Sequence, residues 1–280
     1  GFYSDYKQPK IKALNKADGS EKWSAEQYVS GNFKASKNGR LFQYNSGLIF
    51  EIDTTDGSLL AVYFNQGGGS STTNSWGPAI DKNENLYLGQ CFMRIEGYYE
   101  EPDAVLKINP NDGSAPDVRQ PVWKTQLPGV SIWGAPVLGE DMVYVPTSGG
   151  LYALSASTGN IAWIFETGEA RVNFPVVGDD GKVYFSEWDS TLKQAFMTGV
   201  DKNGMEEFSC IISEDTTNIT DIGNYGNSLT GIVEPLLTDD GKLIMGIGEK
   251  IISIPVTSYG LADSGWPKER VDNNNSGRSK

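Results

Sequence analysis

An internal repeat constrains the fold of this chain more than any other feature of its sequence. The clearest copy covers residues 151–163 and consists of an apolar run, a turn that ends in glycine, and a tryptophan; residues 11–23 repeat this pattern. Weaker copies cover residues 49–57, 105–113, 196–204 and 251–260. The turn glycines of successive copies are 38 to 56 residues apart, which is the period of an architecture built from repeated supersecondary units.

A second repeated unit comes before the first one in each copy. It is clearest at residues 175–185, where two short apolar runs flank an Asp-Asp-Gly turn, and it recurs at 78–88, 135–145, 235–245 and, more loosely, 34–43. Two apolar runs joined by such a turn are typical of a β-hairpin. Each copy therefore holds four short strands, and strands that are apolar on both faces need neighbouring sheets on both sides. Units of about 45 residues that pack in this way predict an all-β protein with the β-propeller fold.

We expect about six blades in a single propeller domain, residues 1–280. The predicted blades are a partial first one at 1–26 and five more at 33–64, 76–127, 133–167, 173–210 and 231–266, followed by a C-terminal tail at 267–280. The chain opens at Gly1 without a methionine, so a second possibility is a natural protein of seven or eight blades that is truncated at its N-terminus here. The partial blade lacks its first strand, which either C-terminal residues or an upstream segment would supply.

The composition excludes several classes of function. Lys and Arg number 23 and Asp and Glu 36, and the net charge of −13 argues against binding to nucleic acids or to an anionic membrane surface. The chain has no histidine, which excludes Ser-His-Asp and Cys-His catalysis and histidine zinc sites. No run of 18 apolar residues is present, so we expect no transmembrane segment. The two cysteines, Cys91 and Cys210, are too few and too far apart for a cysteine zinc site.

The repeat resembles that of a known group of propellers. The pattern Ala-Leu-x-Ala-x-Thr-Gly-x-x-x-Trp at residues 153–163, and the tail at 266–277, resemble the PQQ-like repeat of the quinoprotein alcohol dehydrogenase-like propellers. That group includes pyrroloquinoline-quinone (PQQ) alcohol dehydrogenases and the propeller lipoprotein of the bacterial outer-membrane assembly machine. The resemblance implies that Trp23, Trp123 and Trp163 dock each blade onto its neighbour. It also implies a periplasmic, cell-surface or extracellular location.

The strand order assigns the connections between strands to two faces of the propeller. The short turns that join strands one and two, or three and four, of a blade fall on one face, and the other connections fall on the opposite face. The longest connections, 66–75, 89–103 and 209–230, share that second face, where long loops on a rigid scaffold are often functional. On this face we predict a ligand site of aromatic residues and polar anchors: Trp76, Trp133, Arg171, Asn173, Phe174, Trp188, Tyr98 and Tyr99. The alternative is that these aromatics only pack where each blade begins.

Three functions remain open. We expect a non-catalytic binding or scaffold propeller that takes a protein or glycan ligand, with no cofactor, no metal and no catalytic residue. A PQQ-dependent dehydrogenase is the first alternative; it would hold PQQ and calcium through Arg171, Asn173, Glu187 and Asp189, although the chain lacks the adjacent cysteines and the length of many such enzymes. A cell-envelope assembly factor is the second alternative. Residues 81–85 resemble half of a calcium loop, but they fall where a hairpin turn is expected.

Overall fold

The computed structural model describes residues 11–25, 33–45, 48–64, 77–90, 102–111, 121–168, 170–214 and 234–268. Every regular element in these ranges is a β-strand, so the predicted all-β class is confirmed. None of the described residues belongs to a helix that is long and apolar enough to cross a membrane.

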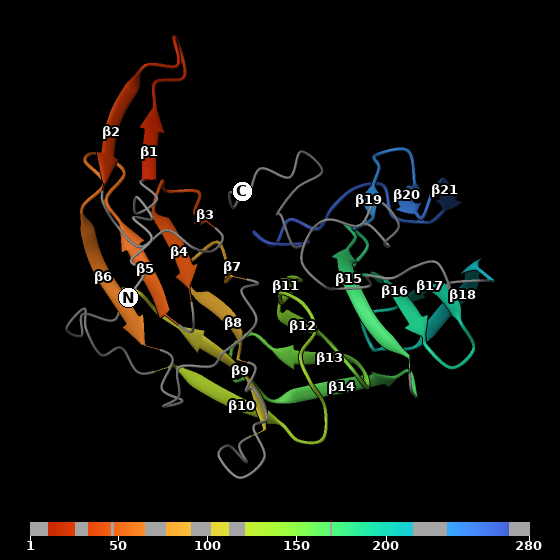
Figure 1. The fold of residues 1–280 in the computed structure, drawn as a ribbon. Helices are drawn as coiled ribbons and strands as arrows, with labels where there is room; N and C mark the ends of the chain where they lie inside the picture. Colours follow the sequence, from red (N-terminus) through yellow and green to blue (C-terminus); the bar gives the residue numbers. More distant parts are fainter. Residues whose placement is uncertain are drawn as a thin grey trace, which may run out of the picture.

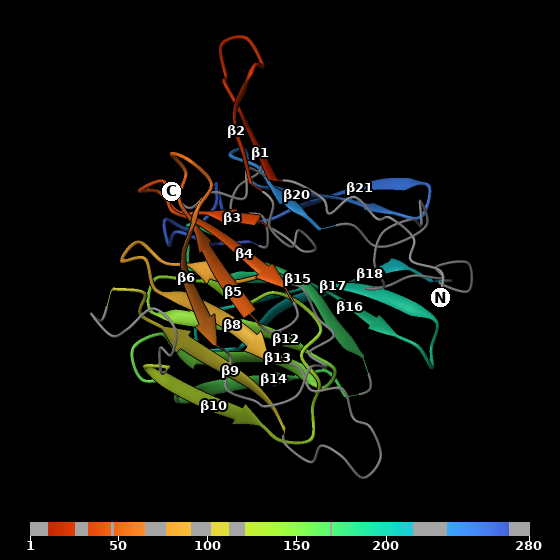
Figure 2. The same ribbon diagram turned by 60° about the vertical axis from the view of Figure 1, so that its left-hand side comes forward.

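The strands form six antiparallel sheets, and each sheet is a meander that follows the order of the chain (Figures 1 and 2). Two strands, β1 (Ile11–Leu14) and β2 (Glu21–Ala25), form the first sheet. The next two sheets have four strands each: β3 (Phe33–Ala35), β4 (Leu41–Asn45), β5 (Leu48–Ile52) and β6 (Leu59–Phe64), then β7 (Ala79–Ile80), β8 (Leu86–Gln90), β9 (Asp103–Ile108) and β10 (Trp123–Leu127).

Two more four-stranded sheets and a three-stranded one complete the described part of the chain. They consist of β11 (Val137–Leu138), β12 (Met142–Thr147), β13 (Gly150–Ser155) and β14 (Ile161–Glu166), then β15 (Arg171–Val177), β16 (Val183–Asp189), β17 (Gln194–Val200) and β18 (Glu206–Ser213), and finally β19 (Leu236–Leu237), β20 (Lys242–Ile247) and β21 (Lys250–Pro255).

These sheets are the blades of a β-propeller. In Figure 1 they stand around a common centre, with β3, β7, β11 and β15 nearest to it and β6, β10, β14 and β18 at the periphery. The described residues therefore form about five blades, to which the pair of β1 and β2 adds a partial one. The predicted propeller is confirmed.

Burial explains why the middle strands read as continuous apolar runs. In β13 every residue from Gly150 to Leu154 is buried, because neighbouring blades cover both faces of the sheet. In the outermost strand β14, by contrast, Ile161 and Ile164 are 40% and 41% exposed, and burial alternates along the strand. The core of the molecule therefore lies between blades rather than inside any one sheet.

Tryptophans and turn glycines meet at three of the seams between blades. The indole Nε1 of Trp163 donates a hydrogen bond to the Lys202 carbonyl of the next blade at 2.9 Å. The equivalent bonds run from Trp23 to the Thr54 carbonyl at 3.0 Å and from Trp123 to the Ala156 carbonyl at 3.2 Å. At Gly204 (φ +82°), a Cβ atom would lie 2.7 Å from the Trp163 ring, so the glycine allows both the turn and the close contact. The repeated glycine and the repeated tryptophan thus belong to one contact.

The seam after β6 has no tryptophan, because Ala61 stands at that position. A polar network occupies this seam instead. The guanidinium of Arg40 donates to both carboxylate oxygens of Glu51, at 2.6 and 2.7 Å, and to the Asn111 side chain of the next blade at 2.9 Å. The Tyr63 hydroxyl also donates to Glu51. All three guanidinium nitrogens of Arg40 therefore donate hydrogen bonds within the fold.

The chain after β21 returns to the centre of the propeller. The Ala262 amide donates to the Val177 carbonyl at 2.9 Å, and the Leu138 amide donates to the Trp266 carbonyl at 2.7 Å. The Trp266 side chain is completely buried, in the same core cluster as Ile80 and Leu138. Residues 261–268 consequently tie together the inner edges of several blades.

Candidate functional site

Five of the eight predicted ligand-site residues are described, and they lie at one end of the propeller. Trp133 lies in the connection between β10 and β11, Arg171 begins β15 and Trp188 stands near the end of β16. Asn173 and Phe174 follow along β15. We call Trp133, Arg171, Asn173, Phe174 and Trp188 the loop-face cluster, and the face that carries it the loop face. Trp76, Tyr98 and Tyr99 lie outside the described residues.

Arg171 joins two tryptophans from different blades. Its guanidinium carbon lies 4.2 Å from the centroid of the Trp133 ring and 5.6 Å from that of Trp188. Such cation–π contacts are favourable because the electron-rich faces of the indole rings attract the positive charge. Arg171 is paired directly with Trp188 across the β15–β16 ladder, so the sheet itself holds these two side chains together.

The β15 strand carries a local distortion inside the cluster. Its pairing with β16 shifts register between Asn173 and Val176. Within this irregularity Phe174 has a φ of +49°, a left-handed conformation that non-glycine residues rarely adopt. Bulges and strained residues are common at functional sites, because they turn side chains away from the regular pleat.

Two hydrogen-bond donors of the cluster are buried without a partner. The Nε1 of Trp133 and the Nδ2 of Asn173 have neither solvent exposure nor a hydrogen-bond acceptor, and Asn173 as a whole is only 3% exposed. A buried donor that lacks a partner costs about 1–3 kcal/mol. Most buried polar groups avoid this cost, so two such donors in one cluster are unusual. Phe174 and Trp188 also pack against the core cluster that contains Val176 and Leu237, as the alternative of blade packing expects.

Gln90 is a polar residue that the sequence analysis did not predict. It ends β8, at the same end of the propeller, and it is fully buried with both its side-chain nitrogen and its oxygen unpartnered. Its only sequence signal is a polar amide at the end of an otherwise apolar run. That signal is too common to single out a site.

The dehydrogenase alternative would use Glu187 and Asp189 as cation ligands. Burial raises the pKa of the Glu187 carboxyl, which favours its uncharged form. The Asp189 carboxylate accepts the backbone amides of Thr191 and Leu192, both at 2.8 Å, and so stabilises its own turn. Among the described residues, no group of three or more Cys, Asp or Glu side chains is placed to hold a metal ion.

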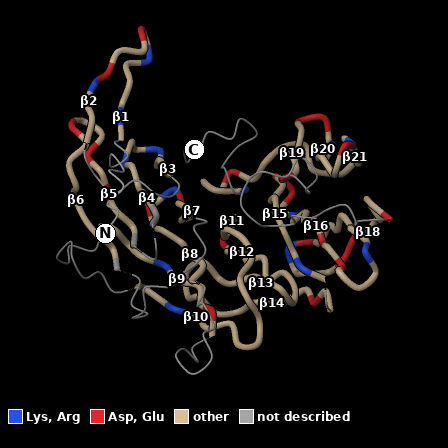
Figure 3. Tube along the Cα trace, in the orientation of Figure 1, with Lys and Arg blue, Asp and Glu red and all other residues tan. Residues whose placement is uncertain are grey.

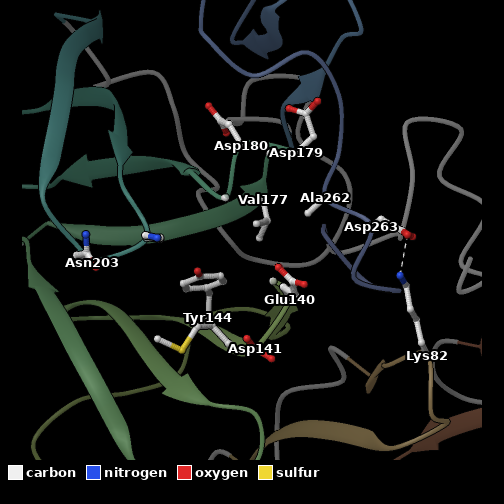
Figure 4. Close-up of a pocket in the computed structure, with 15 residues that line it drawn as sticks. Lys82, Glu140, Asp141, Tyr144, Val177, Asp179, Asp180, Asn203, Ala262 and Asp263 are labelled. Atoms are coloured by element: carbon white, nitrogen blue, oxygen red, sulfur yellow. Dashed lines mark ion pairs between the residues drawn. The ribbon is translucent and has the colours of Figure 1, made fainter.

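The opposite face, formed by the short turns, contains a cavity of about 690 Å³ (Figure 4). Its acidic lining residues are Glu140, Asp141, Asp179, Asp180 and Asp263, and Figure 3 shows acidic positions on the turn after β15. Most of the carboxylates serve the fold: Asp179 accepts the Ser258 hydroxyl at 2.8 Å, Asp180 accepts it at 2.9 Å, and Asp263 pairs with Lys82 at 2.7 Å. The sequence predicts these turns but not the cavity, because the returning segment at 261–268 forms one of its walls.

Comparison with known proteins supports the fold and the repeat. Residues 100–204, which are 105 of the 280 residues, match the family described as outer membrane protein assembly factor BamB. The chain matches no curated protein. The predicted resemblance to PQQ-like repeat propellers is confirmed by this match together with the propeller fold.

Solved propeller structures resemble the chain in fold at low sequence identity. The C-terminal WD40 domain of Sif2 has a TM-score of 0.57 at 11% identity, and the match covers 89% of this chain and 64% of the chain of Sif2. The extracellular domain of the one-component system BT4673 from B. thetaiotaomicron has a TM-score of 0.53 at 11% identity, and the match covers 88% of this chain and 30% of that one. Regucalcin from Agrobacterium tumefaciens, described as a calcium-binding protein, has a TM-score of 0.51 at 10% identity, and the match covers 91% of this chain and 85% of regucalcin. The chain thus spans less than two thirds of the first two structures.

Proposed function

We propose that this propeller is a non-catalytic binding protein whose loop face takes a protein or glycan ligand at the loop-face cluster. The observation that carries the proposal is the state of Arg171 and its neighbours. The guanidinium lies over two indole rings, and the donors of Trp133 and Asn173 are buried without acceptors. Aromatic surface combined with a few fixed polar groups is typical of ligand sites.

The chemistry of the cluster favours binding over catalysis. A dehydrogenase needs a base and a cation held by carboxylates, yet Glu187 is shifted toward its uncharged form and Asp189 caps a turn. The described cysteine, Cys210, lies on the outer strand β18, and burial raises the pKa of its thiol. These residues support a role in which groups position a ligand without transferring protons or electrons.

A role in cell-envelope assembly is the second candidate, and the family match at residues 100–204 favours it. An assembly scaffold is also a binding propeller, so it would use the same face to hold a protein partner. We place the protein in the periplasm or at the cell surface, in keeping with the match to BamB and the likeness to an extracellular domain.

The first experiment exposes the full chain to a glycan array and a peptide array. We expect binding that is lost in Trp188→Ala and kept in Tyr259→Ala, since Tyr259 is an aromatic that is 64% exposed near the turn face and serves as the matched control. Far-UV circular dichroism verifies that both variants fold. Equal loss of binding in both variants, or no binding by either array, contradicts the proposal.

A second assay tests the enzymatic alternative directly. The chain is mixed with PQQ, calcium and a series of alcohols and sugars in a dye-linked oxidation assay. We expect no turnover above that of buffer. Robust oxidation that disappears in Asp189→Ala would replace the binding function with catalysis.

A further inference from the structure

We propose that the loop-face cluster recognises a carboxylate on an acidic peptide segment, with Arg171 as the anchor. This inference rests on the proposed binding function and narrows its ligand class. It follows from three properties of the cluster: an arginine without an acidic partner among the described residues, two buried groups that only donate hydrogen bonds, and indole faces that the guanidinium covers.

Arg171 differs sharply from Arg40, the other arginine in the described ranges. Arg40 forms two hydrogen bonds to Glu51 and a third to Asn111. Around Arg171, no carboxylate of the described residues lies within ion-pair distance, and its recorded contacts are the two indole rings. The chain has 36 acidic and 23 basic residues, so carboxylates outnumber the cations that could pair with them. A guanidinium that lies over two aromatic rings and has no carboxylate partner among the described residues is therefore a suitable anchor for an acid from outside.

The unsatisfied groups of the cluster are donors only. The Trp133 Nε1 and the Asn173 Nδ2 are buried N–H groups without acceptors, and the guanidinium of Arg171 adds further donors to them. Arg171 and Asn173 are two residues apart on one face of β15, which separates their Cα atoms by about 7 Å. A ligand oxygen with several lone pairs matches this set. A carboxylate offers two such oxygens in the planar geometry that a guanidinium binds with two parallel hydrogen bonds.

The stacking within the cluster favours a peptide over a sugar ring. Sugars bind to tryptophan by lying flat on the indole, but the Arg171 guanidinium already covers a face of both Trp133 and Trp188. The N–H groups at the edge of the guanidinium suit the carboxylate at the end of an acidic side chain. Phe174 and Trp188 pack against the core cluster that contains Val176, which fixes the two strands that carry the anchor.

The experiment follows the indole N–H signals of the isotope-labelled full chain by NMR. Trp133→Phe assigns the Trp133 signal. The probes are a capped pentapeptide with a central glutamate, the same peptide with glutamine, and trigalacturonate. We expect the glutamate peptide to shift the Trp133 signal in a saturable manner, and the glutamine peptide and trigalacturonate to leave it in place.

Variants at Arg171 test the anchor. We expect Arg171→Gln to weaken binding of the glutamate peptide at least tenfold and Arg171→Lys to weaken it less, because lysine keeps the charge but loses the two-pronged geometry. Lys250→Gln, which removes an exposed charge from β21, is the matched control and should bind as the parent does. A similar loss in Lys250→Gln would mean that only the overall charge matters, and would overturn the anchor.

The remaining outcomes separate this inference from the proposed function. Equal binding of the glutamine and glutamate peptides overturns the carboxylate while leaving the binding function intact. Binding of trigalacturonate alone overturns the peptide and assigns the site to an acidic glycan. Array binding that depends on Trp188 but not on Arg171 also overturns the inference alone, whereas empty arrays together with unmoved indole signals overturn both.

Discussion

Trp163 and Trp133 lie in two different regions of the propeller, and only the indole N–H of Trp163 has a hydrogen-bond acceptor. Trp163 lies at a seam between blades, where its N–H donates to the Lys202 carbonyl and its ring covers Gly204. Trp133 lies on the loop face, where its N–H is buried without an acceptor and its ring lies beneath Arg171. At the seam the fold itself supplies the acceptor for the indole N–H. In the loop-face cluster the donors of Trp133 and Asn173 have no acceptor.

This difference distinguishes an aromatic residue whose polar group is paired within the fold from one whose polar group is not, without reference to their position in the repeat. A folding contact is stable when its polar groups are paired, because each unpaired buried group reduces the stability that packing provides. A binding site can keep unpaired groups, since the ligand supplies the missing partners. The comparison therefore makes quantitative predictions about what each tryptophan contributes to folding.

The largest effect is expected for Trp163→Ala. The variant removes a ring that packs against Tyr144, with ring centroids 5.7 Å apart, and it empties the seam, so the free energy of unfolding should fall by about 3–5 kcal/mol. Trp188→Ala should cost much less, because that ring belongs to the loop-face cluster. Denaturant titration measures both. Small and equal losses in the two variants would show that Trp163 does not dock the blades.

A smaller effect is expected for Trp163→Phe. Phenylalanine keeps most of the apolar contact but leaves the Lys202 carbonyl without its indole donor. The loss of this single hydrogen bond should lower the free energy of unfolding by about 1 kcal/mol. A variant as stable as the parent protein would mean that the bond contributes nothing and that ring packing alone maintains the seam.

The sequence predicted the propeller because the repeat fixes strand directions, and strand directions decide which residues share a face. The same logic places Trp133, Arg171 and Trp188 together, although Trp133 lies in a connection and the other two lie in β15 and β16 of the next blade. It did not find the position of residues 261–268, because their contacts reach several blades and combine backbone bonds, such as the one from the Leu138 amide to the Trp266 carbonyl, with the burial of the Trp266 side chain. This segment falls after the last repeat, so the repeat pattern does not place it.

The seam after β6 shows a second limit of sequence reasoning. Ala61 signals that the docking tryptophan is missing, but nothing in the sequence indicates what replaces it. The replacement is Arg40 with Glu51 and Asn111, which come from three separate positions in two blades. Side-chain networks of this kind depend on the distance between blades, which the repeat pattern does not encode. Gln90 escaped prediction for a similar reason, since its burial comes from its neighbours.

The smallest change in stability, and the sharpest test of the comparison, is expected for Trp133→Phe. Phenylalanine keeps an aromatic ring beneath Arg171 but removes the Nε1 donor, which is buried and unpartnered. Because the parent already bears the cost of that donor, its removal should leave the free energy of unfolding within about 0.5 kcal/mol of the parent or raise it. The same substitution at Trp163 should lower it, so the two variants are compared in one set of denaturant titrations. If Trp133→Phe lowered the free energy of unfolding as much as Trp163→Phe does, the Trp133 donor would have an acceptor in solution. The loop-face cluster would then be ordinary blade packing rather than a ligand site.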